Sequence, residues 1–151
     1  MHHPLLIRKY CDADIETVID IWFDGWHSIG PGLVHPHSKP EWRERWVSQI
    51  VPTHEIAVAE ADNAVLGFVT FNPETSELSQ LFTGLSEQGR GVGSALINWV
   101  KNRCHDGVHL FTLEINCRSR KFYEKHGFRE TGLSTNAISG LRTVRYEWRD
   151  T

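Results

Sequence analysis

A glycine-rich segment, Gln88-Gly89-Arg90-Gly91-Val92-Gly93-Ser94, is the part of this sequence best suited to bind an anion. Glycines let successive backbone N–H groups approach an anion closely, and the helix expected to begin at Gly91 adds about half a unit of positive charge at its start. A pyrophosphate is the ligand that this arrangement favours. The segment lacks the Lys-Ser or Lys-Thr pair of a P-loop, and Leu96 stands where a dinucleotide-binding turn has its third glycine. A turn without a ligand is the alternative.

A second group of residues lies downstream, where Asn116 is followed by Tyr123 seven residues later and then by Gly127-Phe128. Together with Gln88-x-x-Gly91-x-Gly93, this pattern resembles the GNAT superfamily of acetyl-CoA-dependent N-acetyltransferases. The resemblance is clear from about Glu55 to Phe128, and the expected order of helices and strands on either side agrees with the family fold.

The resemblance implies acetyl-CoA as the cofactor and assigns residues to it. Backbone N–H groups of residues 88–94 would bind the pyrophosphate, while the strand before this segment would offer its backbone to the pantetheine amides. The N–H of Phe82 or Thr83 would face the thioester oxygen, and Asn116 would contact the pantetheine arm. The implied cofactor-binding residues are Leu81, Phe82, Thr83, Gln88, Gly89, Arg90, Gly91, Val92, Gly93, Ser94, Asn116 and Tyr123.

Acetyl transfer to an amine requires a neutral amine and a proton for the departing thiolate. Deprotonating an alkylammonium of pKa about 10.4 at pH 7 costs about 4.6 kcal/mol, so a general base is useful. The family resemblance makes Glu77 the candidate base, directly or through water, with a hydrated strand-end carboxylate as the alternative. It also places the hydroxyl of Tyr123 beside the sulfur as the proton donor, with a buried helix aromatic as the alternative.

Candidate acceptor-binding residues lie on the first expected helix. Trp22 and Trp26 offer an apolar wall, and Asp24 with Glu77 would attract a cationic amine. The alternative for both tryptophans is simple core packing. The loop that follows contains His35-Pro36-His37, but no carboxylate or cysteine completes a ligand set at zinc spacing, so no metal site is predicted.

Hydropathy patterns predict the elements that must position these residues. Helices are expected over 12–30, 38–50, 91–104 and 118–126, with Asp12 and Ser38 as the caps of the first two. Strands are expected over 5–10, 55–60, 65–72, 77–83, 108–115, 128–135 and 141–149. This order predicts an α+β protein with a single mixed, mostly antiparallel sheet of about seven strands and helices on both faces, similar to the GNAT fold.

Length and composition limit the remaining function classes. The 151 residues have room for one domain, so a single N-acetyltransferase domain over residues 1–151 is expected. Sixteen basic and nineteen acidic residues give a formal charge of −3, and no apolar run reaches about 20 residues, so neither a nucleic-acid nor a membrane partner is expected. A cytoplasmic protein is expected, since Met1 to Tyr10 is also too short and too polar for a secretory signal, and the three cysteines without zinc spacing are interpreted as reduced thiols.

The sequence thus predicts an N-acetyltransferase that transfers the acetyl group of acetyl-CoA to a primary amine of a small-molecule or peptide acceptor by direct attack. A non-catalytic acyl-CoA-binding or sensing module of the same fold is the alternative, and a nucleotide-dependent oxidoreductase is a weaker one. The presence of both Glu77 and Tyr123 favours the enzyme. The acceptor is not identified by the sequence, and a homodimer is left open.

Overall fold

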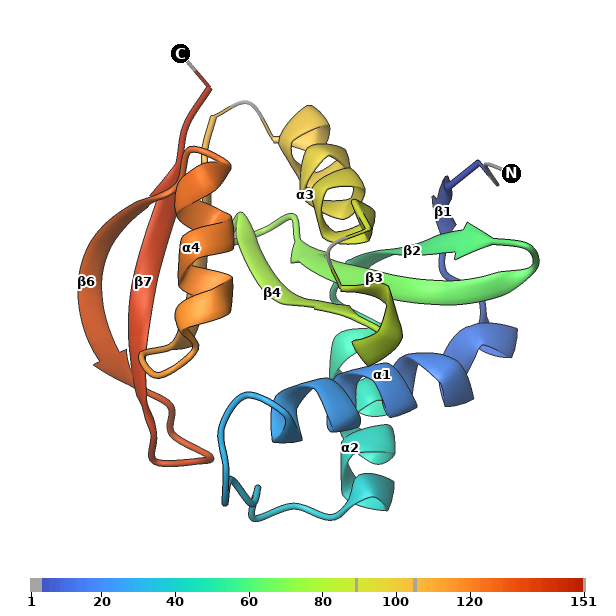
Figure 1. Cartoon of the computed structure of the whole chain (residues 1–151), viewed down its shortest axis with the longest axis horizontal. Helices are drawn as coiled ribbons and strands as arrows, with labels where there is room; N and C mark the ends of the chain where they lie inside the picture. The colour runs from blue at the N-terminus through green and yellow to red at the C-terminus, as the bar shows by residue number, and fades with distance from the viewer. Residues whose placement is uncertain (1–3, 89, 105, 151) are drawn as a thin grey trace.

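The computed structural model of the protein describes residues 4–88, 90–104 and 106–150, and its centre is one seven-stranded sheet (Figure 1). The strand order is β1-β2-β3-β4-β5-β7-β6. Neighbouring strands are antiparallel except β4 and β5, which are parallel, so the predicted mixed and mostly antiparallel sheet is confirmed. The strands are β1 Leu6–Lys9, β2 Glu55–Ala61, β3 Ala64–Asn72, β4 Glu77–Thr83, β5 Val108–Leu113, β6 Arg129–Thr135 and β7 Arg142–Trp148.

Helices cover both faces of this sheet, as the sequence predicts. One hydrophobic cluster joins the sheet to α1 and α2, and a second cluster joins its other face to α3 and α4. None of the helices in the described segments has the length and apolar character needed to span a bilayer. The α-helices are α1 Ile15–His27, α2 Lys39–Arg45, α3 Val92–Arg103 and α4 Cys117–Lys125; α2 continues into the π-helical turn η2 Trp46–Ile50, and the 3-10 turns are η1 Asp12–Asp14 and η3 Leu85–Glu87.

The start of the first helix differs from the prediction that Asp12 caps it. Asp14 directly precedes α1, but its carboxylate makes no capping bond to the helix: it accepts a hydrogen bond from the N–H of Cys11 at 3.0 Å and two from the guanidinium of Arg8 at 2.9 Å. The bonds from Arg8 contribute most to keeping the pKa of the buried Asp14 carboxyl below its usual value, and the bond from Cys11 adds to this effect. Arg8 also binds Glu60 at 2.9 Å, so this network ties β1 and β2 to α1. At the second helix Ser38 is the cap, as predicted.

The helix pair α1 and α2 packs tightly against the sheet. A Cβ atom placed on Gly25 would lie 2.6 Å from Cδ1 of Phe82, so only glycine allows α1 to approach β4 this closely. Trp22 is 2% exposed, and its ring lies 4.5 Å from that of Trp42 and 5.8 Å from that of Trp46. This close packing fixes the position of α1 beside β4.

The parallel pair β4 and β5 stays together at only one end. Among the described residues, their Cα pairing is limited to Glu77 with His109. Beyond that point β4 continues beside β3, and β5 continues beside β7. Because the two strands diverge, each presents an unpaired edge to the opening between them.

Candidate active site

A cleft of about 1060 Å³ lies where β4 and β5 diverge. Its walls come from β4, β5, α1, α2, α4, the turn before α3 and the loop between β6 and β7. Residues far apart in the sequence therefore share one concave surface, as binding sites commonly do. The sequence-predicted residues that line it are Trp22, Trp26, Glu77, Leu81, Phe82, Thr83, Gln88, Gly91, Gly93, Ser94, Asn116 and Tyr123.

The glycine turn at one end of the cleft exposes the start of α3. Gly91 has a φ of 83°, a left-handed conformation that favours glycine, and it directly precedes the first helical residue. The first N–H groups of a helix have no partner within the helix, and here they belong to residues 92–94. Gly91, Gly93 and Ser94 line the cleft, so this helix start can offer N–H donors and a partial positive charge to an anion there.

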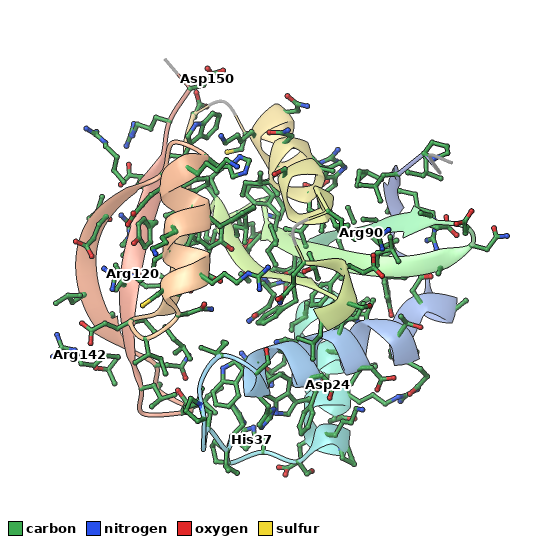
Figure 2. All side chains as sticks on the ribbon, viewed as in Figure 1. Asp24, His37, Arg90, Arg120, Arg142 and Asp150 are labelled. Atoms are coloured by element: carbon green, nitrogen blue, oxygen red, sulfur yellow. The ribbon has the colours of Figure 1, made fainter. Side chains whose placement is uncertain are left out.

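Three predicted members of this turn are placed differently. Arg90 is exposed and pairs with Glu87 at 3.1 Å, so its guanidinium lies outside the cleft lining (Figure 2). Val92 is 2% exposed because its side chain fills the core, which leaves only its backbone for a ligand. Gly89 lies outside the described residues. The cradle is therefore made mainly of backbone rather than of charged side chains.

Gln88 connects the turn to the other side of the cleft. Its Oε1 accepts a hydrogen bond from Nη1 of Arg118, a residue in the first turn of α4 that also lines the cleft. The sequence shows a basic cluster here but does not single out Arg118. Arg120, by contrast, hydrogen-bonds the hydroxyl of Tyr146 at 3.1 Å and pairs with Glu130 at 3.1 Å. Only one of these two arginines is thus directed at the cleft.

The register of β4 decides which backbone groups face the opening. The N–H of Gly84 donates to the carbonyl of Leu66 in β3 at 2.8 Å, and the direction of backbone groups alternates along an antiparallel strand. The backbone of Phe82 therefore also faces β3, so that of the two residues expected to direct an N–H at the thioester oxygen, Phe82 and Thr83, Phe82 does not face the opening. Leu81 and Thr83 direct their backbone groups to the open edge instead.

Tyr123 on α4 is almost fully buried, with 6% of its surface exposed, yet it lines the cleft. Its ring packs at 5.2 Å from Phe122 and 5.5 Å from Phe128. Burial raises the pKa of its hydroxyl well above the ordinary value, so the group stays protonated at neutral pH. No residue in the described part of the chain hydrogen-bonds this hydroxyl, which leaves it able to donate to a ligand.

Glu77 stands beside a polar pair that the sequence did not reveal. A bulge in β4 leaves Ser79 between the partners of Phe71 and Thr70, and the Ser79 hydroxyl lies 2.8 Å from Nε2 of His54. Burial lowers the pKa of His54, and the charge of Glu77 opposes this shift. Glu77, Ser79 and His54 all line the cleft, so a carboxylate acts on an imidazole there.

At the end of the cleft away from the glycine turn, aromatic and histidine side chains form the wall. The ring of Trp26 lies edge-on to that of His35 at 5.0 Å and to that of Trp42 at 6.1 Å. Nδ1 of His35 accepts hydrogen bonds from the N–H of His37 at 3.0 Å and from Nε1 of Trp42 at 3.3 Å. These contacts fold the loop between α1 and α2 against the cleft.

Two predicted acceptor residues have structural positions that limit their roles. Asp24 is exposed and lies outside the cleft lining, where its charge acts on Lys39 (Figure 2). It was predicted for its negative charge, but it stands two residues after Trp22 and belongs to the solvent side of α1. Trp22 contributes to the cleft only as a nearly buried floor.

Comparisons with known proteins agree with this architecture. A model of the acetyltransferase (GNAT) domain family matches residues 34–149. The chain is 24% identical over 139 residues to the uncharacterized N-acetyltransferase MJ1207 of Methanocaldococcus jannaschii, a match that covers 82% of this chain and 60% of that protein. The chain spans less than two thirds of the length of the curated relatives it matches.

Two solved structures share the fold. Apo-form YjaB from Escherichia coli has a TM-score of 0.79 at 20% identity, covering 98% of this chain and 99% of that one. The PaiA N-acetyltransferase of Thermoplasma acidophilum, in complex with coenzyme A, has a TM-score of 0.76 at 19% identity, covering 97% and 99%. At these identities the likeness concerns the arrangement of helices and strands alone.

Proposed function

Because the chain belongs to the GNAT acetyltransferase family, we propose that it transfers an acetyl group from acetyl-CoA to a primary amine by direct attack within the cleft between β4 and β5. The observation that carries this proposal is the placement of Tyr123. Its buried, protonated hydroxyl shares one cleft with the start of α3 and with the open edge of β4.

The residues present fit coenzyme A. The N–H groups at the start of α3 suit a pyrophosphate, and the backbone of Leu81 and Thr83 suits the amides of a pantetheine arm lying along the open strand edge. The side-chain oxygen of Asn116 accepts a bond from the N–H of Ser119 at 3.2 Å, so its NH₂ group is left for the arm. When bound, acetyl-CoA supplies the thioester whose C–S bond is broken.

Protons must move at two places. The amine loses a proton, which Glu77 would accept either directly or through the hydroxyl of Ser79 and the ring of His54. The sulfur gains a proton, which the hydroxyl of Tyr123 would donate while a C–N bond replaces the C–S bond. A backbone N–H of Leu81 or Thr83 would bind the carbonyl oxygen as negative charge develops on it.

The proposal extends to the setting in which the protein works. We place the whole chain in one catalytic domain, since a single sheet carries every wall of the cleft. Cys11, Cys104 and Cys117 are free thiols, which supports a reducing compartment such as the cytoplasm. The acceptor would be a small molecule or a peptide.

Amine-dependent release of coenzyme A tests the proposed reaction. The protein is incubated with acetyl-CoA and a panel of primary amines, and mass spectrometry identifies any acetylated product. We expect coenzyme A and acetylated amine to appear in equal amounts. Acetyl-CoA that binds but is never consumed with any amine would instead favour a non-catalytic acyl-CoA-binding module.

A further inference from the structure

Arg45, the last residue of α2, is a cation without a counter-ion in the part of the chain that the structure describes. It lines the large cleft, and its guanidinium lies 5.9 Å from the centre of the ring of Trp22, which is itself 2% exposed. Within residues 4–88, 90–104 and 106–150, no side chain forms an ion pair or hydrogen bond with it. Burial lowers the pKa of Arg45, whereas the carboxylates bound to Arg8 and the groups bound to Arg120 raise theirs.

The nearest carboxylate on the same helix is already engaged. Glu41 lies one turn before Arg45, a spacing at which the two side chains commonly pair. Its Oε1 instead accepts hydrogen bonds from the N–H of Ser38 at 2.9 Å and from the hydroxyl of Ser38 at 3.0 Å. Because this capping role holds Glu41 at the start of the helix, Arg45 remains without the partner that its sequence offers. A desolvated guanidinium without a carboxylate is costly unless a ligand supplies one.

The cleft lining also contains the carboxylate of Glu77, which stands at the start of β4, apart from Arg45 at the end of α2. The charge of Arg45 acts on His35, and the charge of Glu77 acts on His54, nine residues beyond Arg45 along the chain. Arg45 and Glu77 both line the cleft and do not pair with each other. A molecule that reaches both carries a positive amine at one end and an anionic group at the other.

Building on the acetyltransfer proposed above, we infer that the acceptor is an amine that also bears a carboxylate, such as an amino acid or a short peptide, and that Arg45 binds this carboxylate. The planar guanidinium can donate two parallel hydrogen bonds to a carboxylate, a geometry that fixes orientation as well as adding binding energy. With its carboxylate at α2, the acceptor directs its amine toward Glu77 and the open edge of β4. Arg45 is therefore a specificity-determining residue for the acceptor.

The phosphates of coenzyme A do not account for Arg45. The backbone cradle for pyrophosphate is at the start of α3, which packs on the face of the sheet opposite to α2. Arg118, which bonds Gln88, and Lys125 are the cations of the cleft lining that come from α4. Arg45 lies at the end of α2, and His35 lies in the loop between α1 and α2, away from this cradle.

Pairs of amines that differ only in charge test this inference. Amino acids and dipeptides are each compared with their C-terminal amides, and kcat/KM is measured from coenzyme A release. We expect the acid to exceed its amide by about 10-fold or more, the usual range for a charge-assisted hydrogen bond. In Arg45→Gln this preference should disappear, and Arg45→Lys should restore part of it because it keeps the charge without the two-pronged geometry. Arg43→Gln, which removes an exposed arginine paired with Glu16, is the matched control and should keep the preference.

A binding measurement decides the question independently of turnover. N-acetyl amino acids and their amides are compared, in the presence of coenzyme A, by the shift that each causes in Tm. A larger shift for the acids, lost in Arg45→Gln, supports the carboxylate site even when no amine is acetylated. A failure to acetylate any amine would defeat only the proposed reaction. Equal shifts for acids and amides overturn the inference. An acid preference that persists in Arg45→Gln overturns it as well, because another group then binds the carboxylate.

Discussion

The two ends of the cleft are built in different ways. At the cofactor end, the start of α3 and the edge of β4 present backbone groups, and the predicted Arg90 turns to Glu87. At the acceptor end, the lining consists of side chains such as Trp26, His35 and Arg45, held together by ring contacts and histidine hydrogen bonds. A backbone site depends on a local turn, whereas a side-chain site depends on which elements the fold brings together.

This difference suggests that the two ends respond separately to mutation. Changes at the glycine turn should alter affinity for acetyl-CoA, and changes at Trp26 or in the loop between α1 and α2 should alter affinity for the acceptor. Tyr123 stands between them, so its hydroxyl should affect the chemical step and neither affinity. Each prediction below would break this separation if it failed.

The largest effect is expected from Tyr123→Phe, which removes the proton donor and keeps the ring. Turnover should fall on the order of 10²-fold, while the Kd for acetyl-CoA stays close to that of the wild type. Tyr146→Phe is the matched control, since its hydroxyl bonds Glu124 at 2.7 Å and lies outside the cleft lining. That change should lower stability by about 1.5–3 kcal/mol, because the hydroxyl bonds charged groups, and leave turnover intact. Wild-type turnover in Tyr123→Phe, with chemistry rate-limiting, would assign the residue to packing.

A charge placed at the glycine turn should weaken cofactor binding next most strongly. Gly91→Asp and Gly91→Asn impose similar strain at a φ of 83°, and an added Cβ there meets no heavy atom within 4 Å. Only the aspartate brings a negative charge beside the phosphates, so it should bind acetyl-CoA about 10-fold more weakly than the asparagine variant. Titration calorimetry measures both. Equal affinities would mean that no phosphate lies at this turn.

Removal of the aromatic wall should affect the acceptor alone. Trp26→Ala should raise the acceptor KM several-fold, on the order of 1 kcal/mol, and leave the Kd for acetyl-CoA unchanged. Trp99→Ala, on α3 and outside the cleft lining, is a control for the loss of a half-buried tryptophan. If both variants lose stability alike and neither changes the acceptor KM, Trp26 serves only as packing.

The smallest predicted effect is that of low pH on the loop at the acceptor end of the cleft. Burial, assisted by His37, Arg45 and His27, lowers the pKa of His35, while Glu41 opposes the shift. A histidine with a lowered pKa stabilises its folded loop above its ordinary pKa of about 6.5 and loses that contribution as the pH falls below it. Protonation also removes the lone pair of Nδ1 that accepts two bonds.

We therefore expect the acceptor KM to rise about threefold in the wild type, relative to His35→Asn, between pH 7.5 and 5.5. The comparison with the variant cancels the titration of the amine itself. Cofactor affinity should change equally in both proteins over this range. A wild-type profile that matches that of His35→Asn would remove His35 from the control of the loop.

The sequence predicted most of the fold because its signals are local. A short β-like run after the turn residues Asn72-Pro73-Glu74 predicted β4 with the bounds Glu77–Thr83 that the structure shows, and the Ser38 cap followed from its spacing to Glu41. The prediction that Asp12 caps α1 was wrong: Asp14 precedes the helix, and its carboxylate binds Arg8, a contact between separate elements.

The candidate site was predictable only in part for the same reason. The glycine turn and the spacing from Asn116 to Tyr123 can be read along the chain, and most of those residues line the cleft. Arg45 and His54 were missed, since nothing in the residues around them shows that α2 faces the split in the sheet. Asp24 was chosen for its charge alone, although its spacing of two residues from Trp22 turns it to a different side of α1.

Hydrogen–deuterium exchange with and without acetyl-CoA tests most directly the claim that the backbone at one end of the cleft binds the cofactor. We predict slower exchange in peptides covering residues 79–84 and 91–95, at the edge of β4 and the start of α3. Peptides covering residues 26–42, which form the acceptor end, should exchange as in the free protein. Slower exchange in residues 26–42 with no change in residues 91–95 would contradict the account.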